Sequence, residues 1–522
     1  MEQVVIIGAG PAGLAAAYQI LKKSGGKYQV TVLEATEEIG GISRTVKYAG
    51  NRMDIGGHRF FTKDSDVKEW WEELLPLQGA PAKDDTIRRR GSHLTGEGPD
   101  PEKEDEVMLV RQRISRIYYK KHFFDYPVTL NAATIRNLGF ITCMEAGFSY
   151  LKSCVHKKKE DNLENFYINR FGRKLYSIFF ESYTEKVWGL HPSLMSADWG
   201  SQRVKGLSVM AVLKDGLFKV IGKEPARKET SLIEEFLYPK LGPGQLYEKA
   251  AKEILNMGGE LHLNRRVSGI RVTSDGQYHI QVSDEIGRER DMIKTDYVVS
   301  TMPLRNLCGI YNGMPLDIKK IGLGLKYRDF VTLGLLVDEL ALKNETGIQT
   351  LNGQVPDCWI YVQDKSVKLG RIQIFNNWSP YMVQDPEHTV WIGLEYFCSE
   401  GDRFWNMDPR ELVDFAKDEL IRMGVIHEGT RILDYHKDYA EKAYPCYFGS
   451  YAELGRVKDY LNTQSGIICA GRNGQHRYNN MDHSIKTGML AAEYILDGHR
   501  DPVKKQAVWE VNTEGDYHES KQ

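Results

Sequence analysis

Residues 3–22 have the sequence QVVIIGAGPAGLAAAYQILK, and this stretch decides the fold. The first five residues form a short β-rich apolar run, as expected of a buried parallel strand. A GxGxxG pattern follows, and then a helical run from Leu14 to Lys22. Gly8 permits the tight turn, Gly10 lets the backbone approach a pyrophosphate, and Gly13 lets helix and strand pack closely. This context predicts a Rossmann-like dinucleotide-binding domain, in which the N–H groups at the start of the helix meet phosphate charge.

A second apolar strand, residues 29–33, ends in Glu34. A carboxylate at this point can accept hydrogen bonds from both ribose hydroxyls, and it would repel a 2′-phosphate, which disfavours NADP at this site. The segment IGGISRT follows at residues 39–45. Its Gly pair and Arg44 resemble the FAD superfamily that contains amine oxidases, protoporphyrinogen oxidases, phytoene desaturases and UDP-galactopyranose mutases. The resemblance implies FAD as the cofactor, with the Gly pair and Arg44 near its phosphates.

The composition limits the class of protein. The chain has 522 residues and a formal net charge of −2, which argues against a broad nucleic-acid-binding surface. Seven cysteines without a CxxC pair indicate neither a disulfide framework nor a zinc site, so a reducing cytoplasm fits best. We find no stretch that predicts a transmembrane helix. The apolar residues 148–155 and the lysines at 157–159 leave peripheral membrane contact open, although a solvated helix end is the simpler interpretation.

The patterns along the chain predict an α/β protein whose GR2-type FAD domain is built from separated pieces. A helical segment and an antiparallel β-sheet substrate domain are inserted between those pieces. The run Arg88-Arg89-Arg90, in the polar insertion, could bind an anion, but a solvated charge run is the simpler interpretation. The expected parts are an FAD domain at 1–78, 225–310 and 455–500, a polar surface insertion at 79–106, a mainly helical cap at 107–224, the sheet domain at 311–454, and a loose polar tail at 501–522.

Further segments resemble UDP-galactopyranose mutases in particular. They are GGHRFFT at 56–62, YTEKVWG at 183–189, and the segment from Gly471 to Ser484. The resemblance implies that His58 lies close to the flavin ring, that Tyr183 stacks on a uracil, and that Trp188 lines a sugar-nucleotide pocket. Base stacking of this kind contributes about 1–3 kcal/mol.

Two further arginines match mutase segments, Arg203 on a loop over the substrate and Arg328 at a diphosphate. Two guanidinium forks suit a diphosphate, because each can donate two parallel hydrogen bonds. In the last segment, Arg472 would hold the FAD pyrophosphate and Tyr478 a substrate phosphate. Met481 and Asp482 would bring a helix N-terminus toward the flavin N1–C2 carbonyl edge, which favours negative charge on reduced flavin.

The candidate site residues fall into three groups, and no metal ligands are expected. Trp378 is a departure, because mutases often have a Tyr there and an indole can only donate a hydrogen bond. The catalytic candidates are His58, Arg203 and Arg328. The substrate-binding candidates are Tyr183, Trp188, Tyr327, Trp378 and Tyr478. The cofactor-binding candidates are Gly8, Gly10, Pro11, Ala12, Gly13, Glu34, Gly40, Gly41, Arg44, Gly57, His58, Val267, Gly471, Arg472, Met481 and Asp482.

The resemblance implies a cytoplasmic isomerase of nucleotide-diphosphate sugars with a role in cell-wall polysaccharide biosynthesis. Reduced-flavin N5 would attack the anomeric carbon, and the sugar would change between pyranose and furanose forms. NAD(P)H is a candidate external reductant. The alternative is an FAD-dependent oxidase or dehydrogenase of the amine oxidase or protoporphyrinogen oxidase type, with hydride transfer to N5. A non-enzymatic FAD-stabilised scaffold is a third hypothesis, and the oligomeric state stays open.

Overall fold

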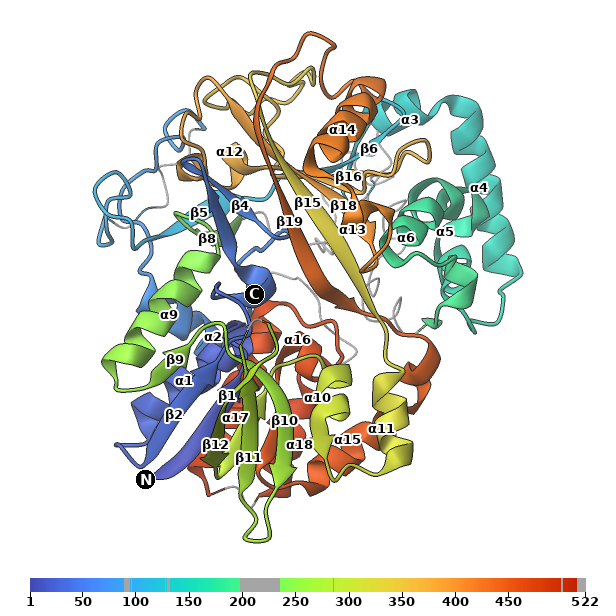
Figure 1. Cartoon of the computed structure of the whole chain (residues 1–522). Helices are drawn as coiled ribbons and strands as arrows, with labels where there is room; N and C mark the ends of the chain where they lie inside the picture. Colours follow the sequence, from blue (N-terminus) through green and yellow to red (C-terminus); the bar gives the residue numbers. More distant parts are fainter. Residues whose placement is uncertain are drawn as a thin grey trace.

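The structure is a computed structural model that describes residues 1–88, 94, 96–126, 128, 132–197, 235–284, 286–498 and 501–513. A parallel sheet forms from pieces that are far apart in the sequence (Figure 1). Its strand order is β20-β13-β1-β2-β9. The strands are β1 (Glu2–Ile7), β2 (Tyr28–Leu33), β9 (Glu260–His262), β13 (Tyr297–Ser300) and β20 (Ile467–Cys469). The prediction of a Rossmann-like FAD-type fold is confirmed.

Two helices pack against this sheet because their contact surfaces carry small residues. Helix α1 (Pro11–Lys23) connects β1 to β2, and α17 (Met481–Leu496) lies against α1. A Cβ atom on Gly488 would lie 2.1 Å from the Ala12 carbonyl oxygen, and one on Gly13 would lie 2.0 Å from the Gly8 carbonyl oxygen. Neither position can take a side chain without separating the packed elements.

A four-stranded sheet adjoins the parallel sheet and has the order β12-β11-β10-β14. Its strands are β10 (Arg266–Val272), β11 (Tyr278–Ser283), β12 (Glu289–Thr295) and β14 (Tyr311–Asn312). The helices of this half of the molecule, besides α1 and α17, are α2 (Ser65–Leu74), α9 (Gly244–Asn256), α10 (Leu304–Ile310), α11 (Leu316–Leu323), α15 (Leu454–Thr463), α16 (Gly471–Gly474) and α18 (Pro502–Glu510).

The prediction of a loose tail at 501–522 is wrong for residues 501–513. Helix α18 buries Val508 and Trp509. Lys505 is also buried, and its ammonium group donates to the carbonyl oxygens of Leu461 and Gln464 at 2.8 and 2.5 Å. Two adjacent apolar side chains are enough to dock this short helix, although the surrounding sequence is polar. The buried Lys505 ammonium is tolerated because carbonyl oxygens at the end of a neighbouring helix accept its hydrogen bonds.

The second half of the molecule is a seven-stranded sheet with the order β19-β15-β18-β17-β16-β6-β7. All neighbouring pairs are antiparallel except β16 and β6, which are parallel. The sheet therefore takes two strands from the segment predicted as a mainly helical cap. Its strands are β6 (Ser115–Tyr119), β7 (His122–Asp125), β15 (Tyr327–Val337), β16 (Trp359–Val362), β17 (Arg371–Ile374), β18 (Val390–Cys398) and β19 (Ile432–Pro445).

Helices cover this sheet and extend beyond it. Helix α14 (Pro409–Met423) packs on the sheet. The helices α3 (Ala132–Leu138), α4 (Phe140–Val155), α5 (Leu163–Phe179) and α6 (Glu181–Trp188) form a group at one side (Figure 1). Two small sheets have two antiparallel strands each, β3 (Thr45–Tyr48) with β4 (Asn51–Asp54) and β5 (Met108–Gln112) with the distant β8 (Glu235–Pro239). The short helices are η1 (Gly41–Ser43), η2 (Pro192–Leu194), η3 (Pro380–Met382), η4 (Gly449–Glu453), α12 (Phe375–Trp378) and α13 (Arg403–Asn406).

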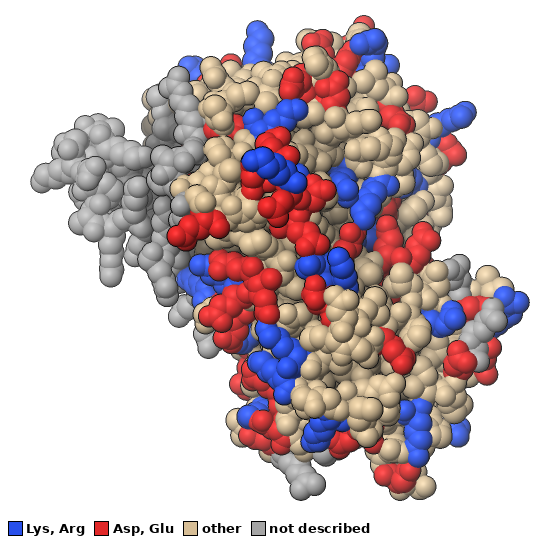
Figure 2. Space-filling view, turned by 90° about the vertical axis from the view of Figure 1, so that its left-hand side faces the viewer, with Lys and Arg blue, Asp and Glu red and all other residues tan. Residues whose placement is uncertain are grey.

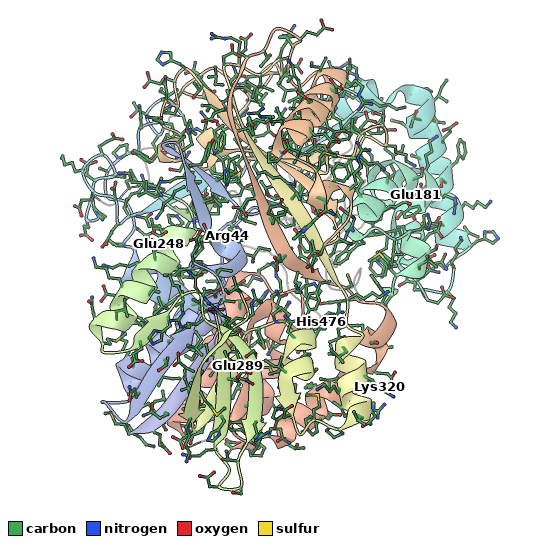
Figure 3. All side chains as sticks on the ribbon, viewed as in Figure 1. Arg44, Glu181, Glu248, Glu289, Lys320 and His476 are labelled. Carbon is green, nitrogen blue, oxygen red and sulfur yellow. The ribbon has the colours of Figure 1, made fainter. Side chains whose placement is uncertain are left out.

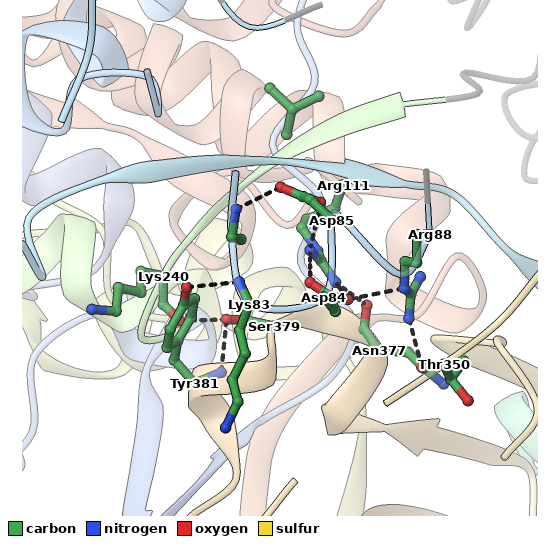
Figure 4. Close-up of polar contacts among 12 residues, drawn as sticks. Lys83, Asp84, Asp85, Arg88, Arg111, Lys240, Thr350, Asn377, Ser379 and Tyr381 are labelled. Carbon is green, nitrogen blue, oxygen red and sulfur yellow. Dashed lines mark hydrogen bonds and ion pairs between the residues drawn. The ribbon is translucent and has the colours of Figure 1, made fainter. Parts of the chain in front are cut away.

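The polar insertion at 79–106 contains a buried ionic network (Figure 4). Asp84 is 1% exposed, and both of its oxygens accept hydrogen bonds from Arg111, at 2.8 and 2.6 Å. Arg88 pairs with Asp84 at 2.9 Å and donates to Asn377 at 2.8 Å. The prediction that Arg88 belongs to a solvated charge run is therefore wrong. Inside the protein, the Asp84 carboxylate pairs with Arg88 and with Arg111 of the distant strand β5, so the charges neutralise each other.

No helix among the described residues is long and apolar enough to cross a membrane. Within the same ranges, no group of three or more His, Cys, Asp or Glu side chains could hold a metal ion. Figure 2 shows Lys and Arg interspersed with Asp and Glu over one face of the molecule. The described part of that face lacks the single-sign field that a nucleic-acid-binding surface presents.

Candidate active site

The glycine-rich turn after β1 forms a cradle of bare backbone. Gly8 has φ +104°, and a Cβ there would lie 2.2 Å from the Thr301 hydroxyl. Gly10 precedes helix α1, and no side chain caps this helix. A Cβ on Gly41 would lie 3.5 Å from the Gly10 Cα, so two glycines from two different turns face each other. The uncapped N–H groups of α1 are therefore available to a phosphate.

Glu34 lies where a ribose-binding carboxylate is expected. It follows β2, and one carboxylate oxygen accepts the Ala9 N–H at 2.8 Å. The other oxygen accepts the Thr36 N–H at 3.0 Å. These bonds hold the carboxylate beside the glycine-rich turn, as the fingerprint requires.

Arg44 links the two halves of the molecule (Figure 3). Its guanidinium forms ion pairs with Glu38 and Asp438, both at 2.6 Å. Two carboxylates thus hold this cation at the end of the second glycine turn. Its place near the cofactor phosphates stays a prediction.

The late Gly-Arg turn and the start of α17 lie next to the cradle. Gly471 has φ +79°, and a Cβ there would lie 3.0 Å from the Ala12 Cβ. Arg472 donates to the Asn479 carbonyl at 2.8 Å and to the Ala443 carbonyl at 3.0 Å. Met481 begins α17, and burial raises the pKa of Asp482 to about 7. Val267 is buried on β10, in a cluster with Ile7 and Leu33.

His58 is a buried, neutral imidazole. Burial and the nearby Arg472 lower its pKa to about 3. Its Nδ1 has no hydrogen-bond partner among the described residues. Gly57 beside it is exposed, and a Cβ there would lie 2.2 Å from the Trp359 ring. Three features together fit a bound flavin dinucleotide. They are the His58 nitrogen without a hydrogen-bond partner among the described residues, the exposed Gly57, and the start of helix α1 without a side-chain cap.

Several aromatic and arginine side chains converge beside His58, and we call them the aromatic–arginine cluster. Tyr444 stacks on Tyr478 with ring centroids 5.4 Å apart, and Trp188 meets Tyr444 edge to face at 6.0 Å. The Arg472 guanidinium lies 4.8 Å from the Tyr478 ring centroid. The cluster consists of Trp188, Trp359, Arg371, Tyr444, Arg472 and Tyr478. It brings α6, the seven-stranded sheet and the loop before α17 together at one place.

Sequence reasoning missed Arg371 and Glu395. They are register partners on β17 and β18, and their charged groups lie 2.5 Å apart. Arg371 also donates to the Tyr444 hydroxyl at 2.6 Å. Burial raises the pKa of Glu395, and the adjacent guanidinium opposes that rise. The available signal was a single charge in each of two strand-like runs, RIQI and WIGLEYF.

Arg328 holds the end of helix α6 in place. It donates to the Val187 carbonyl at 3.1 Å, to the Phe397 carbonyl at 3.3 Å and to the Ser399 hydroxyl at 2.8 Å. A Cβ on Gly189, which has φ +67°, would lie 3.1 Å from the Arg328 guanidinium carbon. The structure thus gives Arg328 a positioning role for α6.

The other substrate candidates lie at different depths. Tyr183 is half-buried and meets Tyr361 edge to face at 5.8 Å. The Tyr327 hydroxyl donates to the Asn473 carbonyl at 3.4 Å. Trp378 is fully buried, and its ring centroid lies 5.3 Å from that of Tyr238. This environment favours a packing role for Trp378 over the predicted contact with substrate. Arg203 lies outside the described residues.

The model of the flavin-containing amine oxidoreductase family matches residues 11–496. The chain belongs to this family. FAD is its cofactor, as the sequence predicts, and the family places the chain among flavoenzymes. Curated relatives match only a small part of the chain. An L-amino-acid oxidase of Crotalus adamanteus is 45% identical over 69 residues, which cover 13% of each chain. Polyamine oxidase 1 of Oryza sativa is 41% identical over 54 residues, or 10% of each chain.

Solved structures resemble nearly the whole chain. A reduced UDP-galactopyranose mutase has a TM-score of 0.76 and 21% identity, and the match covers 99% of this chain and 100% of that one. A cyclohexylamine oxidase of Brevibacterium oxydans has a TM-score of 0.60 and 13% identity, with 95% and 99% covered. At these identities, the similarity shows the shared fold.

Proposed function

We propose that this flavoenzyme interconverts ring forms of a nucleoside-diphosphate sugar with reduced FAD. The single observation that supports the proposal is the charge of the aromatic–arginine cluster. The Arg472 guanidinium lies against Tyr478, 4.8 Å from its ring centroid, and Trp188 and Tyr444 line the same place. Burial lowers the pKa of His58, and the positive charges of Arg472 and Arg371 lower it further. A cationic, aromatic-walled site suits a diphosphate joined to a planar base.

The chain's residues would divide the work as follows. The glycine turns, Glu34 and the start of α1 would hold the FAD. Reduced flavin supplies the nucleophile for the anomeric carbon. Tyr478 and Arg472 would stabilise the negative charge of the departing diphosphate with hydrogen bonds. Hydrogen bonds to charged groups contribute about 1.5–3 kcal/mol each. His58, neutral at pH 7, would present a nitrogen that can donate or accept.

The direct test is turnover by the reduced protein. The holoprotein is reduced with dithionite, mixed with UDP-galactopyranose, and the products are separated by chromatography. We expect a furanose product that forms only with the reduced protein. Tyr478→Phe keeps the ring stack and removes the hydroxyl, so turnover should fall while FAD stays bound. Tyr396→Phe is the matched control, because Tyr396 also stacks on another ring, that of Phe404, with the ring centroids 5.3 Å apart. Absence of any furanose product would refute the proposal.

Family membership favours a second candidate, the oxidation of an amine. Curated relatives of that kind match short parts of the chain, and an amine oxidase shares its fold. An ammonium substrate would, however, meet the Arg472 guanidinium as a like charge. If this candidate is correct, an amine will reduce the flavin under anaerobic conditions, and its absorbance band will bleach.

A further inference from the structure

Helix α4 presents an apolar face outward. The side chains on this face are between 45% and 77% exposed. At about 3.6 residues per turn they fall within an arc of roughly 100°, over a length of about 22 Å. They are Phe140, Ile141, Met144, Phe148, Leu151 and Val155. Figure 1 shows α4 at the outer edge of the molecule, away from the parallel sheet.

The opposite side of α4 fixes this orientation. Ala146, Tyr150 and Ser153 are buried against the protein. Helix α5 approaches so closely that a Cβ on Gly172 would lie 2.7 Å from the Tyr150 backbone nitrogen. Because that side is packed, α4 cannot rotate its apolar face inward without losing these contacts.

Lysines border the outward face. Lys152 lies in the last turn of α4, and Lys157, Lys158 and Lys159 follow the end of the helix. All four are exposed, and none of their ammonium groups forms an ion pair with the described residues. Of the nearby acidic residues, Glu145 pairs with Lys174 and Glu160 pairs with Arg170. Asp161 is exposed and accepts hydrogen bonds from Asn162 and Asn165. Four lysines against this one acid leave the border of the face with an excess of positive charge.

We propose that α4 docks on an anionic lipid surface. The helix would lie in the plane of the interface, with its phenylalanines and aliphatic residues among the acyl chains and its lysines at the phosphate level. An apolar arc with a cationic border is the composition of interfacial helices. A second copy of the same face would bring the same excess of lysines against these lysines, so charge complementarity favours the lipid. This role is separate from the proposed sugar chemistry.

The test is flotation of the full-length holoprotein with vesicles of phosphatidylcholine alone or mixed with phosphatidylserine. We expect binding to the mixed vesicles only, weakened by salt. Replacing Lys157, Lys158 and Lys159 with Glu should weaken binding at least about 100-fold, at roughly fivefold per lost lysine. The double variant Phe148→Ser/Leu151→Ser should weaken it at least about tenfold. Both variants should keep the flavin absorbance band.

Leu316→Ser is the matched control, because Leu316 is 75% exposed on α11 and lies outside this face. It should bind the mixed vesicles like the unaltered protein. Failure of the unaltered protein to float with them would overturn the proposal. So would a lysine variant that binds normally. A dimer in solution that Phe148→Ser/Leu151→Ser converts to a monomer, without vesicle binding, would assign the face to a second copy instead.

Discussion

Breaking the buried pair of Arg371 and Glu395 should destabilise the protein strongly. Glu395 is fully buried, Arg371 is 8% exposed, and Glu395→Gln would leave the guanidinium without a counter-ion. The Phe397 ring lies 4.6 Å from that guanidinium and cannot replace a carboxylate. Removal of one partner from such a pair costs about 3–5 kcal/mol. We expect this loss in the free energy of unfolding, measured by urea denaturation of the holoprotein.

The chain offers a matched exposed pair as the control. Arg456 and Asp317 are 2.6 Å apart, but their side chains are 52% and 60% exposed. Asp317→Asn should cost only about 0–1 kcal/mol, because water screens the pair. The double variant Arg371→Met/Glu395→Leu should regain most of the loss, since it leaves no buried charge. If Glu395→Gln destabilised no more than Asp317→Asn, Arg371 would have another counter-ion and the reasoning would fail.

Three further changes test the fold and the cradle. Asp482 has a folded pKa of about 7, above its unfolded value, so its contribution to stability is present at low pH and lost as pH rises through 7. The stability advantage of wild type over Asp482→Asn should therefore shrink by about 1.4 kcal/mol between about pH 5 and pH 6, in parallel urea titrations. Gly57→Ala would drive a Cβ into Trp359, so the FAD-to-protein ratio should fall, whereas Gly455→Ala, with open space around it, should leave the ratio unchanged. Trp509→Ala should lower the free energy of unfolding by about 3–5 kcal/mol in urea, and a loss below 1 kcal/mol would show that α18 is not docked.

The dinucleotide half was predictable because its determinants are local. Gly8 needs a positive φ, Gly13 needs a missing Cβ, and Glu34 ends a strand, and all three requirements appear within one short stretch. The family resemblance, and not a local pattern, predicted that His58, Trp188 and the segment around Tyr478 lie close together. Their functional roles stay predictions.

The errors share a physical cause, which is pairing across long sequence separations. Asp84 and Arg111 look like surface charges until a strand brings them together in the core. Arg371 and Glu395 look like ordinary strand charges until β17 and β18 align in register. The parallel contact of β6 with β16 likewise depends on packing that no local pattern encodes.

The most direct test of the proposed chemistry is the affinity for UDP before and after reduction. Titration calorimetry under anaerobic conditions would compare the oxidised holoprotein with the dithionite-reduced holoprotein. We predict tighter UDP binding to the reduced form, and loss of that gain in Tyr478→Phe. Equal or absent UDP binding in both oxidation states would contradict a nucleotide-sugar function.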